Sequence, residues 1–174
     1  MAKEKIKTKN LVPKNTGYII SNPDYSHAND NLQLLRITVT NLETKVDFGY
    51  QATSYYTNGG WIKISPKTFI RPKGTNKKLI LTNASNIPYG PEKLHFNSSI
   101  EWRYFSLHFP PILEDTNDKK SLMFDTAEPR TIESIDLIEN EKGDDTDFNF
   151  YGIRLDDESK KSNINFFESK NNIK

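Results

Sequence analysis

Alternation of apolar and polar residues with a period of two is the feature that most constrains the fold of this chain. Leu35, Ile37 and Val39 alternate with polar residues, and the same pattern returns between residues 46 and 53. Successive side chains of a β-strand point to opposite faces of a sheet, so this period is typical of half-buried strands. Residues 41–44 lie between the two segments and suit a turn. The sequence therefore predicts a β-hairpin, with Leu35, Ile37 and Val39 sharing one face.

Short apolar segments bounded by turn residues continue along the rest of the chain. They lie at residues 61–64, 69–70, 79–81, 100–109, 132–138 and 148–155. Proline cannot donate a hydrogen bond to a sheet, so Pro66 and the pair Pro110-Pro111 end the strands that precede them. About seven to nine short strands separated by turns, without a long amphipathic helix, predict an all-β fold.

The predicted arrangement of these strands is an antiparallel, immunoglobulin-like (Greek-key) β-sandwich. A closed barrel is disfavoured, because the strands differ in length and the linker at 111–131 is long enough to cross between two sheets. Only 34% of the residues are hydrophobic and the mean hydropathy is −0.73, which is low for a compact domain. We therefore expect flexible N- and C-terminal arms: a Lys-rich leader at 1–31 and a polar tail at 156–174, on either side of a sandwich domain at 32–155.

Composition also excludes several classes of function. The sequence has no cysteine, which excludes disulfides, thiolate metal sites and thiol nucleophiles. The net charge is +1 and the basic cluster at 71–78 is a single turn without interleaved aromatic residues, so we expect no nucleic-acid partner. No apolar stretch is long enough to span a bilayer or to form a signal-peptide core. We expect no cofactor, because phosphate-binding and dinucleotide-binding motifs are absent from the sequence.

The aromatic residues supply the candidate binding positions. In the segment 100–109, the apolar set Phe105, Leu107 and Phe109 alternates with a set that starts at Trp102 and Tyr104, which we therefore expect to face outwards. Flat rings bury a large area at a small entropic cost, so they suit a protein contact or stacking on a sugar. The predicted contact surface consists of Tyr55, Tyr56, Trp61, Trp102 and Tyr104. Alternatively, both tryptophans fill the interface between the sheets or lie beneath the 111–131 linker.

Metal and catalytic motifs are weak. Asp144, Asp145 and Asp147 lie near Gly143, but their order does not match a calcium-binding loop, so we favour a solvated hairpin tip for this segment. His27, His95 and His108 are scattered without the spacing of metal ligands. The serines lack a nucleophile motif. We therefore expect a protein that is not an enzyme, with a hydrolase built from distant residues as the least favoured hypothesis.

Three sequence blocks occur in a recognisable order: GGWIKISPKTFI at 59–70, FSLHFPPI at 105–112, and IDLIE at 135–139 followed by FYGIRL at 150–155. They resemble uncharacterised exported β-sandwich domains of Bacteroidetes, which often precede thioredoxin-like domains in TlpA-related lipoproteins. The resemblance implies a periplasmic or cell-surface location and assigns no catalytic residue. The sequence departs from that family because it has no Cys-x-x-Cys motif, no export signal and no lipidated cysteine.

Pattern and resemblance together favour a binding function. We expect a non-enzymatic, extracytoplasmic binding or assembly module that contacts an envelope protein through the aromatic surface. The alternative hypothesis is a carbohydrate-binding module that uses the same rings to stack on a glycan.

Overall fold

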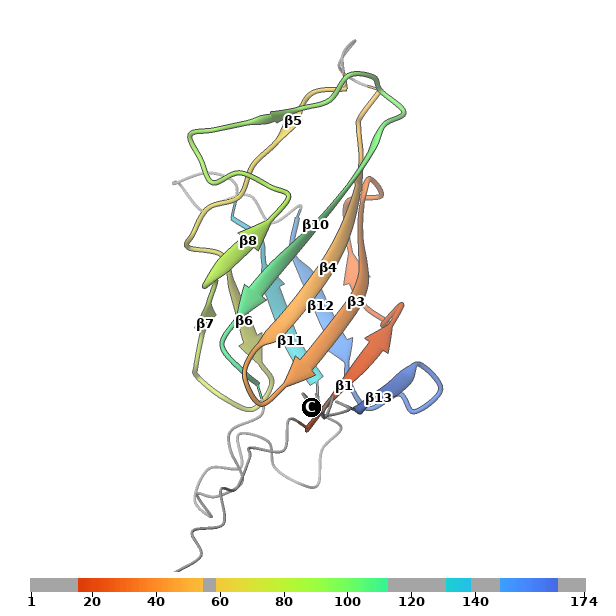
Figure 1. The fold of residues 1–174 in the computed structure, drawn as a ribbon, viewed down its shortest axis with the longest axis vertical. Helices are drawn as coiled ribbons and strands as arrows, with labels where there is room; N and C mark the ends of the chain where they lie inside the picture. Colours follow the sequence, from red (N-terminus) through yellow and green to blue (C-terminus); the bar gives the residue numbers. More distant parts are fainter. Residues whose placement is uncertain (1–15, 55–58, 113–130, 139–147, 166–174) are drawn as a thin grey trace, which may run out of the picture.

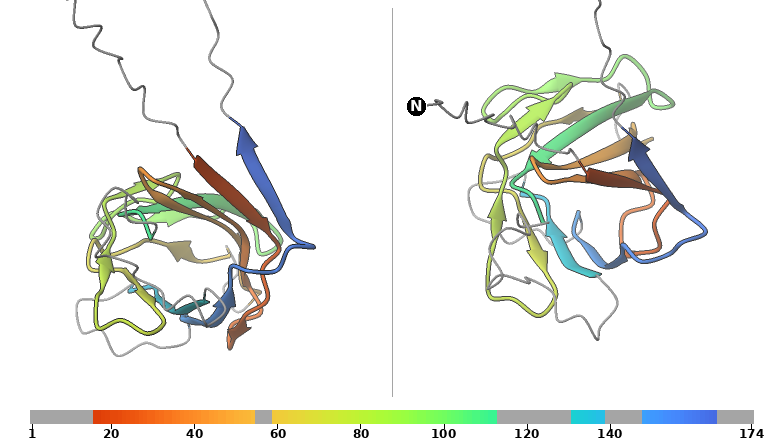
Figure 2. Two further views of the ribbon diagram at one scale, coloured as in Figure 1. Left: turned by 90° about the horizontal axis from the view of Figure 1, so that it is seen from below. Right: turned by 60° about the horizontal axis from the view of Figure 1, so that its bottom comes forward.

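The computed structural model describes residues 16–54, 59–112, 131–138 and 148–165 (Figure 1). All secondary structure in these residues is β, and every pairing between named strands is antiparallel. Two larger sheets pack face to face, and a two-stranded sheet lies at one end (Figures 1 and 2). The prediction of an all-β antiparallel sandwich is therefore confirmed. Its immunoglobulin-like, Greek-key detail stays a prediction.

The six-stranded sheet has the order β13-β1-β3-β4-β10-β8. Its strands are β1 (Thr16–Ser21), β3 (Leu32–Thr40), β4 (Thr44–Gln51), β8 (Asn83–Ser85), β10 (Trp102–Phe109) and β13 (Lys161–Asn165). β3 and β4 form the predicted hairpin. Thr40 shapes its turn, because the Thr40 hydroxyl accepts hydrogen bonds from the backbone N–H groups of Leu42 and Glu43 at 3.2 and 3.1 Å.

The five-stranded sheet lies behind the first in Figure 1 and has the order β2-β12-β11-β6-β7. Its strands are β2 (Ser26–His27), β6 (Phe69–Pro72), β7 (Leu79–Ile80), β11 (Thr131–Asp136) and β12 (Phe150–Arg154). The two-stranded sheet pairs β5 (Trp61–Ile62) with β9 (Leu94–His95). Strands that follow one another in the sequence often belong to different sheets. The two large sheets each cover the apolar face of the other.

Phe48 on β4 is at the centre of the core between the two large sheets. The centroid of its ring lies 5.2 Å from that of Phe105 on the adjacent β10, and 5.5 Å from that of Phe150 on the opposite sheet. All three rings are buried. The largest fully buried side chains are Phe48, Phe109, Phe150, Ile20, Ile37, Ile70, Leu107, Ile112, Ile132, Ile135, Ile153 and Leu155.

A β-bulge in β3 corrects the predicted placement of Leu35. Leu34 pairs with Phe48 and Arg36 pairs with Asp47, so two steps along β3 match a single step along β4. The extra residue shifts the alternation by one position. Leu34 and Ile37 are buried in the core, whereas Leu35 is only half-buried and lies on the outer face of the sheet. The prediction that Leu35 shares a face with Ile37 was wrong for this reason.

The expectation of flexible arms was wrong for residues 16–31 and 161–165. β1 and β2 lie inside the predicted leader, and β13 lies inside the predicted tail and pairs with β1. Ile20 of β1 is fully buried against β3, and Lys160 forms an ion pair with Asp24 at 2.6 Å. The apolar alternation in β1 is short and flanked by lysine-rich sequence, which hid it. Residues 1–15 and 166–174 lie outside the described part of the chain.

Candidate functional site

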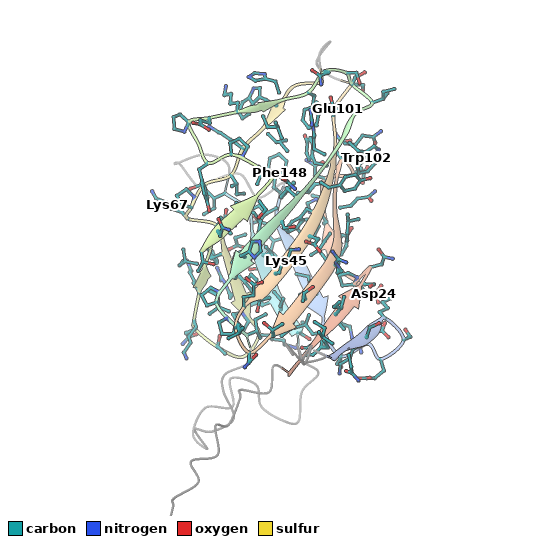
Figure 3. All side chains as sticks on the ribbon, in the orientation of Figure 1. Asp24, Lys45, Lys67, Glu101, Trp102 and Phe148 are labelled. Carbon is teal, nitrogen blue, oxygen red and sulfur yellow. The ribbon has the colours of Figure 1, made fainter. Side chains whose placement is uncertain are left out.

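The candidate site is the outer face of the six-stranded sheet, the side that faces away from the core. β10 separates the two faces as its alternation predicts: Phe105, Leu107 and Phe109 are buried, whereas Tyr104 is 62% exposed. Along this strand the outer face carries Trp102, Tyr104, Ser106 and His108. Figure 3 shows Trp102 toward one end of this sheet and Lys45 of β4 further along it.

Trp102 and Tyr104 form an aromatic pair on this outer face. Their ring centroids are 6.4 Å apart, and their planes differ by only 14°. Both rings approach Gly49 on β4, since a Cβ there would lie 3.3 Å from Tyr104 Cε1 and 3.4 Å from Trp102 Cζ3. Any side chain at position 49 would therefore press on both rings. The absence of a side chain at Gly49 leaves room for the aromatic pair to lie close to the sheet.

An open depression of about 450 Å³ adjoins Tyr104 of the aromatic pair. Tyr104 and Leu35 form part of its wall, and most of its other lining residues are polar. The polar lining residues are Ser21, Asn22, Arg36, Lys45, Asp47, Asn86 and Ser106. We call this feature the outer depression. It places hydrogen-bond donors and acceptors beside an exposed aromatic ring.

Asp47 is the electrostatic centre of the outer depression. Its carboxylate accepts hydrogen bonds from the Ser106 hydroxyl and from Arg36 Nε, each at 2.6 Å, and Lys45 Nζ lies 3.3 Å away. Burial raises the pKa of Asp47, but the hydrogen bonds from Ser106 and Arg36 and the charges of Lys45 and Arg36 outweigh this effect. The net result is a pKa below its usual value of 3.8. Asp47 is thus held as a charged acceptor that orders three donors around it.

An Asp47→Asn variant should lose about 1–3 kcal/mol of stability at pH 7, because the amide cannot replace the charged acceptor. The lowered pKa means that the unfolded chain binds the proton more readily than the folded one. The contribution is therefore fully present above pH 3.8, and it disappears as the pH falls through the lower pKa of the folded state. Urea unfolding of both proteins between pH 7 and pH 2.5 measures this. The control is Glu133→Gln, at an exposed position, whose effect on stability should be small. The assignment would be contradicted if the difference in unfolding free energy between the wild type and Asp47→Asn stays constant over that pH range, or if it is as small as that of Glu133→Gln.

Trp61 does not share the outer face with the aromatic pair. It lies on β5 and lines a cavity of about 50 Å³ together with Leu32, Tyr50 and Phe105, which belong to the core side of the six-stranded sheet. Lys93 Nζ lies 3.9 Å from the centroid of the Trp61 ring and Lys63 Nζ lies 5.3 Å from it, so two cations cover the indole. The structure therefore does not bring Trp61 together with Trp102 and Tyr104 in one surface.

The other predicted positions fall elsewhere or outside the description. Tyr55 and Tyr56 lie in 55–58 and Asp144, Asp145 and Asp147 lie in 139–147, both of which are outside the described residues. The three histidines lie in three different sheets, on β2, β9 and β10. His27 stacks on Phe150 at 3.9 Å between ring centroids, and its Nδ1 lies 2.8 Å from the backbone oxygen of Asn149.

Sequence reasoning missed the residues that complete the outer face. Gly49 and Asp47 occupy polar positions of the β4 alternation, which is a usable signal, but their relation to Tyr104 and Ser106 depends on the pairing of β4 with β10. Arg36 also lies at a polar position of the β3 alternation, whereas Leu35 reaches this face through the bulge, which leaves no signal in the single sequence. Recognition of the site therefore needed the register between strands.

Comparisons of the chain with protein-family models, with curated proteins and with solved structures gave no significant match. The resemblance to exported Bacteroidetes domains, and the envelope location that it implies, therefore stay predictions. Within the described ranges, no helix is long and apolar enough to cross a membrane.

Proposed function

We propose that this protein binds carbohydrate on the outer face of the six-stranded sheet. The observation that carries the proposal is the aromatic pair beside the outer depression. Two nearly parallel rings offer apolar surface to the C–H faces of a sugar, and Asp47, Arg36 and Asn86 offer polar groups to its hydroxyls. The depression is open, which suits a chain of sugar units that extends beyond the site.

The electrostatics of the site favour a neutral ligand. Arg36 and Lys45 together carry one more charge than Asp47, but both cations lie beside the Asp47 carboxylate, which also receives a hydrogen bond from Ser106. A strongly charged ligand would have to break these pairs, whereas sugar hydroxyls can add to them as both donors and acceptors. We therefore expect neutral oligosaccharides to bind better than phosphorylated or sulfated ones.

A Tyr104→Ala or Trp102→Ala variant should bind an oligosaccharide at least about tenfold more weakly, because removal of a stacking ring costs about 1.4 kcal/mol or more. Calorimetric titration with cello-, xylo-, manno- and chito-oligosaccharides measures this. The matched control is Tyr151→Ala, since Tyr151 is 43% exposed on the five-stranded sheet and should leave the affinity unchanged. An equal loss of affinity in Tyr151→Ala, or no loss of affinity in Tyr104→Ala and Trp102→Ala, would exclude the outer face as the binding site.

The second candidate function is contact with an envelope protein. Ile100, in the turn that precedes β10, is also 77% exposed. Exposed aromatic and aliphatic side chains of this kind anchor protein interfaces. If no oligosaccharide binds, but an immobilised wild-type protein retains an envelope protein that Tyr104→Ala does not, the second candidate replaces the first.

A further inference from the structure

Ser85, His108 and Glu43 form a hydrogen-bonded chain on the outer face that has no role in the proposed binding function. The Ser85 hydroxyl lies 3.4 Å from His108 Nε2, and His108 Nδ1 lies 2.9 Å from a carboxylate oxygen of Glu43. The three residues come from β8, from β10 and from the turn between β3 and β4. A hydroxyl, an imidazole and a carboxylate in this order are the components of an activated serine nucleophile.

The carboxylate of Glu43 sets the proton positions in this chain. An ionised carboxylate only accepts hydrogen bonds, so His108 Nδ1 carries the proton and donates it to Glu43. In the neutral imidazole, Nε2 then has a free lone pair and accepts the Ser85 O–H. The side chain of His108 is 18% exposed, which shields these bonds partly from water. His108 is thus oriented as a general base toward Ser85.

The backbone around the cluster holds the two strands in register. Ser85 pairs with Ser106 and Asn83 pairs with His108, so Ser85 is the diagonal neighbour of the histidine on the same face. Thr82 donates hydrogen bonds from its N–H and its hydroxyl to the carbonyl oxygen of His108, at 2.8 and 2.9 Å. These bonds anchor edge strand β8 to β10 where the hydroxyl meets the imidazole.

We propose that Ser85 is a nucleophile that accepts an acyl group from carboxylic esters and passes it to water. Ser85 Oγ attacks the ester carbonyl carbon while its proton moves to His108 Nε2. The C–O bond to the alcohol then breaks, and His108 returns the proton to the leaving alkoxide. Water attacks the acyl carbon as His108 Nε2 takes its proton; the bond from that carbon to Ser85 Oγ then breaks, and His108 gives the proton to Oγ, which frees the acid and restores Ser85. The net reaction is ester plus water to acid plus alcohol, and it needs no other reactant.

The geometry limits the substrate class. The cluster lies on an open sheet face, where water weakens electrostatic stabilisation of the tetrahedral intermediate. Esters have better leaving groups than amides, so they are the expected substrates. Asn86, which follows Ser85, lines the outer depression, and that depression is polar rather than a deep apolar slot. We therefore expect short acyl groups such as acetyl, with turnover slow compared with enzymes that have closed clefts.

Labelling of the full chain with a fluorophosphonate, followed by tryptic mass spectrometry, tests the proposal. The probe forms a Ser–O–P bond with loss of fluoride, and Ser85 is the only serine in the tryptic peptide from Leu79 to Lys93. We expect one phosphonyl group on this peptide, none on it in Ser85→Ala, and about 10²-fold slower labelling in Glu43→Gln, where the imidazole loses its orienting carboxylate. The rate of p-nitrophenol release from p-nitrophenyl acetate should likewise be highest in the wild type, lower in Glu43→Gln and lowest in Ser85→Ala.

The matched control is Ser159→Ala, because Ser159 also hydrogen bonds to a carboxylate, that of Asp157 at 2.6 Å, but forms no hydrogen bond to a histidine within the described part of the chain. This variant should label and hydrolyse as the wild type does. Circular dichroism of each variant separates lost chemistry from lost folding. An unlabelled Leu79 to Lys93 peptide in the folded wild type, or a rate in folded Glu43→Gln equal to that of the wild type, would overturn the proposal. Whatever the labelling shows, Ser85→Ala should bind carbohydrate as the wild type does. The test of ester hydrolysis at Ser85 is therefore independent of the test of carbohydrate binding.

Discussion

A Phe48→Ala variant is expected to lose about 3–5 kcal/mol of unfolding free energy, because the substitution removes a fully buried ring and leaves a cavity. Phe48 is the residue through which β4 contacts both its neighbour Phe105 and Phe150 of the opposite sheet. In a chain of this length, that loss lowers the melting temperature by roughly 10 °C. Thermal unfolding followed by circular dichroism measures the change.

Tyr104→Ala is the control for this prediction, because Tyr104 is an aromatic residue on the outer face of the same sheet and is mostly exposed. Its removal should change the free energy of unfolding by less than about 1 kcal/mol. If Phe48→Ala unfolds at the same temperature as Tyr104→Ala, the two large sheets do not pack through Phe48 as described.

Gly59→Ala should also be strongly destabilising, and Gly74→Ala provides a matched comparison. Both glycines have a left-handed backbone, with φ of 77° and 79°. A Cβ at Gly59 would clash with the carbonyl oxygen of Ser98 and lie 2.8 Å from Ala52 Cβ and 2.9 Å from Phe96 Cβ, whereas a Cβ at Gly74 meets nothing within 4 Å. The conformational cost of about 1–2 kcal/mol is common to both variants, so the difference between them isolates the clash.

We expect Gly74→Ala to remain folded, with an unfolding free energy lower by about the shared conformational cost. Gly59→Ala should lose at least about 2 kcal/mol more unfolding free energy than Gly74→Ala, or should not fold. Urea unfolding of the two variants side by side gives the comparison. Similar stabilities would mean that the segment at Gly59 does not pack against Ala52 and Phe96 as the structure has it.

The part of the fold that follows from local alternation could be predicted from the sequence. Phe105, Leu107 and Phe109 are buried and Tyr104 is exposed because β10 runs without interruption, so a period of two gives its faces directly. Leu35 was misplaced because a bulge depends on how β3 pairs with β4, which the sequence of β3 alone does not determine. β1 was missed because its two inward residues, Tyr18 and Ile20, are too few to stand out next to a lysine-rich segment.

The candidate sites depend even more on long-range pairing. Ser85 and His108 are 23 residues apart in sequence, and His108 and Glu43 are 65 apart, so no spacing rule connects them. Their contact exists because β8 joins the edge of the sheet beside β10. Trp61 was predicted to share a surface with Trp102, but the structure places Trp61 on β5 of the two-stranded sheet and Trp102 on β10 of the six-stranded sheet. Residue type indicated binding aromatics, but only the arrangement of sheets shows which of them share a surface.

The most direct test of the binding face uses the two tryptophans as separate reporters, since the chain contains only Trp61 and Trp102. In Trp61→Phe, the remaining fluorescence comes from Trp102 on the outer face, and in Trp102→Phe it comes from Trp61. Both variants are titrated with the oligosaccharides named above. We predict that the tryptophan fluorescence of Trp61→Phe shifts saturably on titration, with the affinity of the wild type, and that the fluorescence of Trp102→Phe does not shift. A shift confined to Trp102→Phe, or no response of either variant to any oligosaccharide, would contradict carbohydrate binding at the outer face.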